Sequence, residues 1–134
     1  MNEHGYLEEA WENARQQGTL FLISYAKDRR MVPYSEFVAH IHAVQFEGPH
    51  DPRLWHLLGE ISEAESRAGR GMLSSLVVHK DGDYQPGPGF FELARRLGHD
   101  VQDIEKFWIQ EVKRVFAVWA KQDQKRGPRG PCGG

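Results

Sequence analysis

The chain has 134 residues and a mass of 15.4 kDa, and its 40% hydrophobic and 27% charged residues suit one domain with one hydrophobic core. A formal net charge of −2 excludes a strong overall attraction to nucleic acid, and the single cysteine, Cys132, excludes an intramolecular disulfide and a cysteine metal cage. Because no run of about 18 apolar residues and no apolar leader occurs, we expect a cytoplasmic protein without a membrane span.

Two apolar patterns follow each other at the start of the chain. The first has helical spacing and predicts a helix over residues 6–17, closed by Gly18 in the left-handed conformation. The second, residues 20–26, is apolar at almost every position, which fits either a buried strand or a buried helix. We favour the helix. The residues of the first pattern are Leu7, Ala10, Trp11 and Ala14.

Two further helices are predicted by their start signals. Residues 32–34 read as extended chain, and Ser35 as the N-cap of a helix with an apolar stripe from Phe37 to Val44. Asp51 as N-cap, with Pro52 as first helical residue, predicts a helix to residue 68. Its expected inward residues, before a terminating Gly69, are Leu54, Leu57, Leu58, Ile61, Ala64 and Ala68.

The segment from Gly69 to Leu97 is the most unusual stretch of the sequence. Residues 72–79 form the best predicted strand, and the Asp81-Gly82 pair that follows suits the tight turn of a hairpin. After the turns of residues 86–89, helical spacing resumes and continues to Gly98.

The last predicted helix keeps one apolar face from Ile104 to Trp119. Beyond residue 121 the Gly- and Pro-rich composition predicts a flexible tail, so we expect one globular domain over residues 1–121 and a tail over 122–134. The wide apolar arc of the last helix fits a homodimer as well as plain core packing.

The order of the predicted elements resembles a winged-helix domain, in which a β-hairpin wing follows a helix-turn-helix. We therefore expect an α+β, mostly helical, winged-helix-like fold with one small β-hairpin and a long C-terminal helix. The resemblance implies that the helix over residues 51–68 contacts the ligand and that residues 80–85 form the tip of the wing.

Two shorter resemblances concern parts of the chain. Residues 32–37 resemble the winged-helix opening of DNA alkyltransferase-like proteins, but the Pro-Cys-His-Arg motif of those enzymes does not occur here. The phrases Gly-Met-Leu-Ser-Ser-Leu-Val-Val (71–78) and Pro-Gly-Pro-Gly-Phe-Phe-Glu-Leu-Ala (86–94) resemble a family of small bacterial proteins of unknown function. Neither resemblance implies an activity.

The distribution of charge leads to a non-enzymatic binding module as the first functional hypothesis. Residues 106–129 hold seven Lys or Arg against two acids, so the first expected partner is nucleic acid, bound through a winged-helix-like surface. The alternative is a protein-interaction or regulatory subunit that uses Tyr84, Phe91 and the aromatic last helix. The expected contact residues are Arg70, Lys80, Asp81, Tyr84, Lys113 and Arg114, with Lys125 and Arg126 beyond them.

An enzyme is the third hypothesis. A cleft at the turn segment would bring together His79, Asp81 and Glu92, although these also read as ordinary surface residues. His40 and His42 are two residues apart and would point in different directions on a helix. We therefore expect no metal and no other cofactor.

Overall fold

The computed structural model describes residues 7–47, 51–79 and 86–126, with residues 121–126 as helical backbone. Helices dominate this part of the chain and a two-stranded sheet accompanies them, which confirms a mostly helical α+β fold. The elements in chain order are α1 (Glu8–Lys27), β1 (Val32–Pro33), α2 (Tyr34–His40), α3 (Pro52–Arg67), the 3-10 helix η1 (Leu73–Leu76), β2 (Val77–Val78), α4 (Pro88–Arg96) and α5 (Ile104–Arg126).

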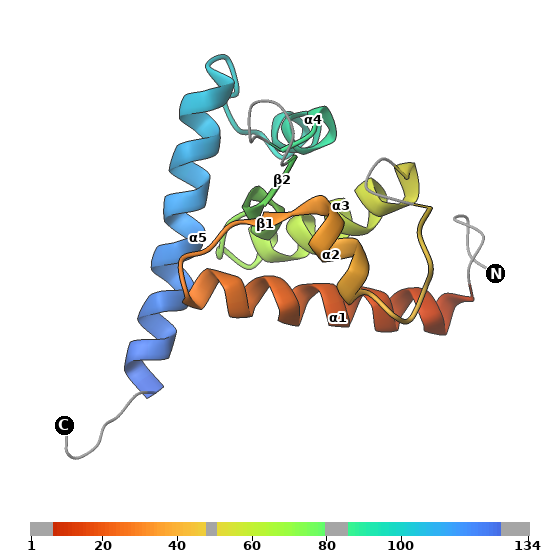
Figure 1. The fold of residues 1–134 in the computed structure, drawn as a ribbon. Coiled ribbons are helices and arrows are strands. Elements are labelled where there is room, and N and C mark those ends of the chain that lie inside the picture. The colour runs from red at the N-terminus through yellow and green to blue at the C-terminus, as the bar shows by residue number, and fades with distance from the viewer. Residues whose placement is uncertain (1–6, 48–50, 80–85, 127–134) are drawn as a thin grey trace.

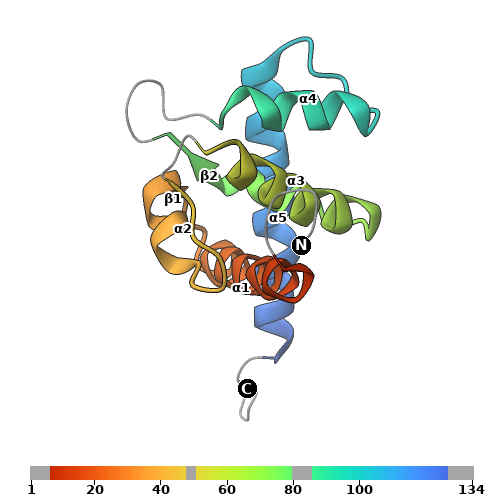
Figure 2. The same ribbon diagram turned by 90° about the vertical axis from the view of Figure 1, so that its right-hand side faces the viewer.

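The helices form a stack that is crossed by one long helix. In Figures 1 and 2, α3 lies between α1 and α4, and α5 runs across the stack. One cluster of buried side chains lies between α1, α2, α3 and η1, and a second lies where α4 meets the start of α5. The second cluster contains Phe91, which is therefore a core residue and not the partner contact expected of it.

Helix α1 continues through Gly18 to Lys27, so the predicted end at Gly18 is wrong and the helical reading of residues 20–26 is confirmed. Gly18 is buried beside α2 and α3. A β-carbon at this position would lie 2.9 Å from Phe37 Cζ and 3.0 Å from Ile61 Cδ1. Close packing of side chains from three helices therefore requires glycine here, rather than a left-handed turn.

We expect Gly18→Ala to lower the stability and Gly59→Ala to raise it, although both glycines lie inside helices. Alanine is favoured over glycine in a helix interior by about 1 kcal/mol. At Gly59 a β-carbon would meet only Leu93 Cδ2, at an ordinary contact distance of 3.8 Å. Gly59→Ala therefore keeps the stability that alanine adds to a helix interior. At Gly18 the added methyl group displaces the buried Phe37 ring, which costs about 1–3 kcal/mol.

Urea unfolding measures both changes, and each variant serves as the control for the other. A urea midpoint that falls for Gly18→Ala and rises for Gly59→Ala would confirm that Phe37 and Ile61 fill the space beside Gly18. A Gly18→Ala protein as stable as Gly59→Ala would contradict it.

The strand predicted over residues 72–79 is largely wrong, because Leu73–Leu76 form η1 and only Val77–Val78 of this stretch form a strand. A contact with α3 contributes to the difference. The Ser74 backbone N–H donates to Ser62 Oγ of α3 at 2.8 Å, so this N–H is not available to a strand ladder.

The two strands are parallel, with Val77 opposite Val32, and α2 and α3 connect them. Hairpin strands are antiparallel and joined by a short turn. These strands therefore do not form the small β-hairpin that we expected. The tip of the proposed wing, residues 80–85, lies outside the described residues, and the winged-helix resemblance stays a prediction.

The start of α3 is confirmed at atomic detail. Asp51 accepts a hydrogen bond from Arg53 N at 2.9 Å, Pro52 opens the helix, and Gly69 follows its end with a φ of +81°. Four of the expected inward residues are buried, whereas Ala64 and Ala68 are exposed. The buried four are Leu54, Leu57, Leu58 and Ile61.

Two predicted helix boundaries are wrong. Helix α2 begins at Tyr34 after Pro33, so Ser35 is an exposed helical residue and not the N-cap, and the helix already ends at His40. Helix α5 extends to Arg126, so residues 122–126 are helical where we expected the flexible tail to begin.

Candidate functional site

A pocket lies between α3 and α4, at the end of the Gly69–Leu97 segment. Its volume is about 20 Å³, which is room for about one water molecule. Apolar side chains form most of the wall, and none of the described residues that line it is charged. The lining residues are Tyr34, Trp55, Leu58, Gly59, Ser74, Gly87, Gly89, Phe90 and Leu93.

Tyr34 places a hydroxyl group at this pocket. The side chain is only 5% exposed, and its oxygen accepts a hydrogen bond from Gly87 N at 3.1 Å. Burial raises the pKa of this hydroxyl, and the weaker opposing effect is the hydrogen bond from Gly87. Tyr34 is therefore a neutral hydrogen-bond donor at physiological pH.

His79 and Gly87 complete the surroundings of Tyr34. The imidazole of His79 stacks on the Tyr34 ring, with 4.4 Å between the ring centroids. A β-carbon on Gly87 would lie 3.2 Å from His79 Nε2 and 3.5 Å from Tyr34 Oη. Glycine at this position therefore lets the backbone reach the tyrosine hydroxyl.

Ser74 contributes a second hydroxyl group. Its Oγ lies 2.5 Å from Ser62 Oγ, and both serines are buried. Ser62 Oγ also accepts from the Ser74 backbone N–H at 2.8 Å, so two hydrogen bonds join these two residues.

The N-terminus of α4 faces the same pocket. Gly87 is the N-cap residue and offers no side chain, Pro88 has no N–H, and the first turn contains no acidic residue. Phe90 N donates to Gly87 O at 3.1 Å, whereas Gly89 N–H has no acceptor within the described residues. The first turn of α4 thus carries no carboxylate of its own at the positive end of the helix dipole.

Trp55 lies at the edge of the pocket and is 37% exposed. Its ring makes no aromatic contact and its indole N–H no hydrogen bond within the described part of the chain. Partly exposed aromatic side chains beside a pocket are typical of binding surfaces. The sequence analysis missed both Tyr34 and Trp55 as site residues.

The predicted contact residues are divided between two regions. The Arg114 side chain packs beside Gly71, the residue that follows Arg70 in the chain, and Lys113 is exposed on α5. Lys80, Asp81 and Tyr84 lie outside the described residues. The side chains of Lys125 and Arg126 are likewise outside them.

Arg70 and Arg114 are each paired with a buried carboxylate. Arg70 donates to Glu65 at 2.8 and 2.9 Å and lies 5.9 Å from the centre of the Trp119 ring. Arg114 Nε lies 3.6 Å from Glu111 Oε1. Glu111 was not predicted, because it occupies a position of the apolar stripe of α5; its Oε2 accepts from Met72 N at 2.8 Å.

No hydrogen bond or ion pair between described residues connects His79 with Glu92, two residues of the enzyme hypothesis. His79 packs on Tyr34, whereas Glu92 is exposed on α4 and makes no hydrogen bond or ion pair with any described residue. Asp81 lies outside the described residues. A catalytic group formed by these three side chains stays a prediction.

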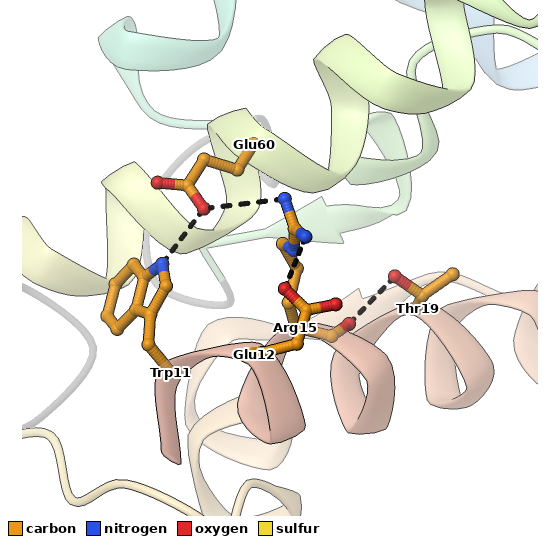
Figure 3. A network of polar contacts seen from close by, with 5 residues as sticks. All are labelled: Trp11, Glu12, Arg15, Thr19 and Glu60. Atoms are coloured by element: carbon orange, nitrogen blue, oxygen red, sulfur yellow. Dashed lines mark hydrogen bonds and ion pairs between the residues drawn. The ribbon is translucent and has the colours of Figure 1, made fainter. Parts of the chain in front are cut away.

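A second hollow of about 420 Å³ lies between α1 and α3. Three of its charged side chains, Glu12, Arg15 and Glu60, are paired with one another, and the fourth, Glu65, is paired with Arg70. Figure 3 shows that Glu60 accepts from Trp11 Nε1 at 2.8 Å and lies 3.9 Å from Arg15, which is also paired with Glu12. Thr19 donates to Arg15 O at 2.8 Å. The two contacts of Glu60 connect α3 to α1, whereas the other two lie within α1, so the polar groups of this hollow have a structural role.

Comparisons of the chain with protein-family models, with curated proteins and with solved structures find no match. Within the described residues, no helix is both long enough and apolar enough to cross a membrane.

Proposed function

We propose that the protein is a non-enzymatic binding module and that its contact surface is the α3–α4 face around Trp55. The observation that carries this proposal is a partly exposed tryptophan without a partner in the described structure, beside a pocket with aromatic and glycine walls. Tryptophan is enriched among the residues that dominate protein–protein affinity. The expected partner is a protein segment with an apolar side chain.

The charges of the chain favour a protein partner over nucleic acid. Arg53, Arg67, Arg70 and Arg114 each lie within 4.0 Å of a carboxylate oxygen of the same chain. A phosphate would have to compete with these carboxylates for the same guanidinium groups. The acids of α3 also make that helix a poor surface for a phosphate backbone.

Nucleic acid is the second candidate, and the exposed cations of α5 support it. Lys106 and Lys113 are exposed, seven residues apart on this helix, and no ion pair holds them within the described residues. On this hypothesis, Lys106→Glu with Lys113→Glu abolishes a gel shift measured at low salt, and binding weakens steeply as salt is added.

Trp55→Ala tests the protein-binding proposal. We expect the variant to fold normally and to bind its protein partner roughly 30-fold more weakly, since a central tryptophan contributes about 2 kcal/mol or more. The partner is first captured with the purified wild-type chain, and affinities are then measured by calorimetry with the purified partner.

Leu20→Ala is the matched control, because Leu20 is an apolar side chain that is 68% exposed and lines the hollow between α1 and α3 rather than the α3–α4 pocket. Equal affinities of the Trp55→Ala and wild-type chains would overturn the proposal. Nucleic acid that co-purifies with the chain and depends on Lys106 and Lys113 would favour the second candidate instead.

A further inference from the structure

The C-terminal end of α1 carries cations that form no ion pair with any residue the structure describes. These are Lys27, in the last turn of the helix, and Arg29 and Arg30 just after it. Both arginines of α3, by contrast, are held by carboxylates of the same chain. Asp28 contributes one negative charge and the dipole of α1 about half of one, so this end of the helix keeps a positive charge.

Arg29 occupies a backbone position that is glycine after α3 and α4. Its φ is +55°, and it is the one described residue other than glycine with a positive φ. After each of these three helices, the N–H of the left-handed residue and the next N–H donate to carbonyls three and five residues earlier. The corresponding residues are Gly69 and Gly98, with φ of +81° and +94°. Arginine is disfavoured in this conformation, so the chain carries the Arg29 side chain at a cost in backbone energy, which is typical of functional positions.

A row of stacked side chains lies beside these cations. The Arg30 guanidinium carbon lies 4.7 Å from the centre of the Tyr25 ring, which in turn lies 4.8 Å from the centre of the Phe21 ring. The His40 ring of α2, the helix beside α1 in Figure 2, stacks on Phe21 with 4.0 Å between the ring centres. Arg30 and His40 are exposed, whereas Tyr25 and Phe21 are half-buried. The two inner rings of this α1–α2 row therefore hold a guanidinium group and an imidazole at the surface.

Phosphate groups and nucleobases complement the chemistry of this surface. Lys and Arg side chains bind the phosphates of nucleic acids, and unpaired bases stack on aromatic rings and on guanidinium planes. An acidic peptide would use the cations but not the planar groups. In a duplex the faces of the bases are covered by their neighbours, so the planar groups favour a single strand.

We propose that the end of α1 and the α1–α2 row bind single-stranded nucleic acid. Lys27 and Arg29 contact phosphates, while the exposed members of the row, Arg30 and His40, stack on bases. This surface goes beyond the function proposed above, because none of its residues lines the pocket beside Trp55. Single-stranded DNA and RNA share this chemistry.

Fluorescence anisotropy with labelled oligo(dT) and oligo(U) of about 12 nucleotides measures the binding. We expect a Kd on the order of 10 μM at about 50 mM salt, and about 20-fold weaker binding at about 200 mM salt, because three phosphates are neutralised. A duplex of the same length is expected to bind at least about 5-fold more weakly than the single strand. A preference for one of the two oligonucleotides identifies the sugar of the natural ligand, and equal affinities show that the surface does not distinguish the sugars. Either result supports the proposal.

Arg29→Gly separates binding from stability. Glycine suits the left-handed conformation, so we expect a urea midpoint at or above that of the wild type. The loss of one phosphate contact is expected to weaken oligonucleotide binding about 5-fold at low salt and to reduce its salt dependence. Arg95→Ala is the matched control and leaves the affinity unchanged, because Arg95 is an exposed arginine in the last turn of α4 that likewise has no ion pair to a described residue.

Two substitutions of His40 test the stacking on bases. His40→Ala is expected to weaken binding about 5-fold, since the stacking of a base on an aromatic ring contributes at least this factor. His40→Phe keeps a planar ring on Phe21 and is expected to restore most of the affinity. A surface that acts through charge alone would not distinguish alanine from phenylalanine at this position.

Absence of oligonucleotide binding at about 50 mM salt, or unchanged affinity in a folded Arg29→Gly chain, would overturn the inference. Displacement of the oligonucleotide by oligoglutamate at an equal concentration of charge would overturn it too, because the surface would then bind any polyanion. Loss of binding in the Lys106→Glu, Lys113→Glu chain but not in Arg29→Gly would place the nucleic acid on α5 instead.

The same variants keep this inference distinct from the proposed function. If Arg29→Gly loses the oligonucleotide while Trp55→Ala retains the protein partner, the nucleic-acid surface stands and the assignment of the α3–α4 face fails. If Trp55→Ala loses the protein partner while Arg29→Gly retains the oligonucleotide, the proposed function stands and the nucleic-acid surface fails.

Discussion

Phe37→Ala is expected to destabilise the protein by about 3–5 kcal/mol, a large part of the 5–15 kcal/mol that stabilises a typical domain. The Phe37 side chain is 0% exposed, and its ring lies against Gly18 and within 6.2 Å of the Phe21 ring. Its removal leaves a cavity between α1, α2 and α3 that these helices cannot close. Urea and thermal unfolding measure the loss.

Two further variants connect this loss to the packing of Gly18. Phe21→Ala, at a half-buried neighbour, is expected to cost less than Phe37→Ala. In a Phe37→Leu chain the shorter side chain frees space, so Gly18→Ala becomes less destabilising than it is in the wild type. Additive effects of the two substitutions would contradict the contact between residues 18 and 37.

Asp51→Ala is expected to destabilise the protein by at least about 2 kcal/mol, and the effect depends on pH. The buried carboxylate accepts from Glu47 N at 2.9 Å, from Arg53 N at 2.9 Å and from the Arg53 side chain at 2.7 and 3.0 Å. It thus caps α3 and fixes the chain that leads into it.

The Arg53 side chain, more than the backbone hydrogen bonds, holds the pKa of Asp51 well below its ordinary value. A depressed pKa in the folded state means that the ionised carboxylate stabilises the fold above the pKa of the unfolded chain, near 3.9, and that this contribution falls as the pH drops below about 4. Unfolding midpoints of wild type and Asp51→Asn are therefore expected to converge between about pH 4 and pH 2.

Asp100→Asn is the control for this experiment, because Asp100 is an exposed carboxylate whose one hydrogen bond among the described residues is from Gln102 N. A stability difference between wild type and Asp51→Asn that stays constant from neutral pH to pH 2 would contradict the assigned role of Asp51.

The sequence predicted those parts of the fold that depend on interactions between residues close together in the chain. The Asp51-Pro52 start of α3 was predicted because a cap and a proline act within one turn of the helix. Gly18 was misread because a glycine after an apolar stripe usually ends a helix. Its actual role depends on Phe37 and Ile61, which only the tertiary fold brings to it.

The candidate site was harder to predict for the same reason. Tyr34, Trp55 and Gly87 come from three separate segments, and none has a sequence motif that marks it as a site residue. The predicted cations Arg70 and Arg114 are each paired with a buried carboxylate, Glu65 and Glu111 respectively. Charge counts along a sequence do not show such pairing.

The contacts of residues 32–34 give one short stretch of chain two structural roles. Residues 32–33 pair with β2, and the Tyr34 hydroxyl oxygen accepts a hydrogen bond from Gly87 N at the start of α4. A substitution that displaces this stretch would therefore release two parts of the fold together, β2 and the N-terminal end of α4.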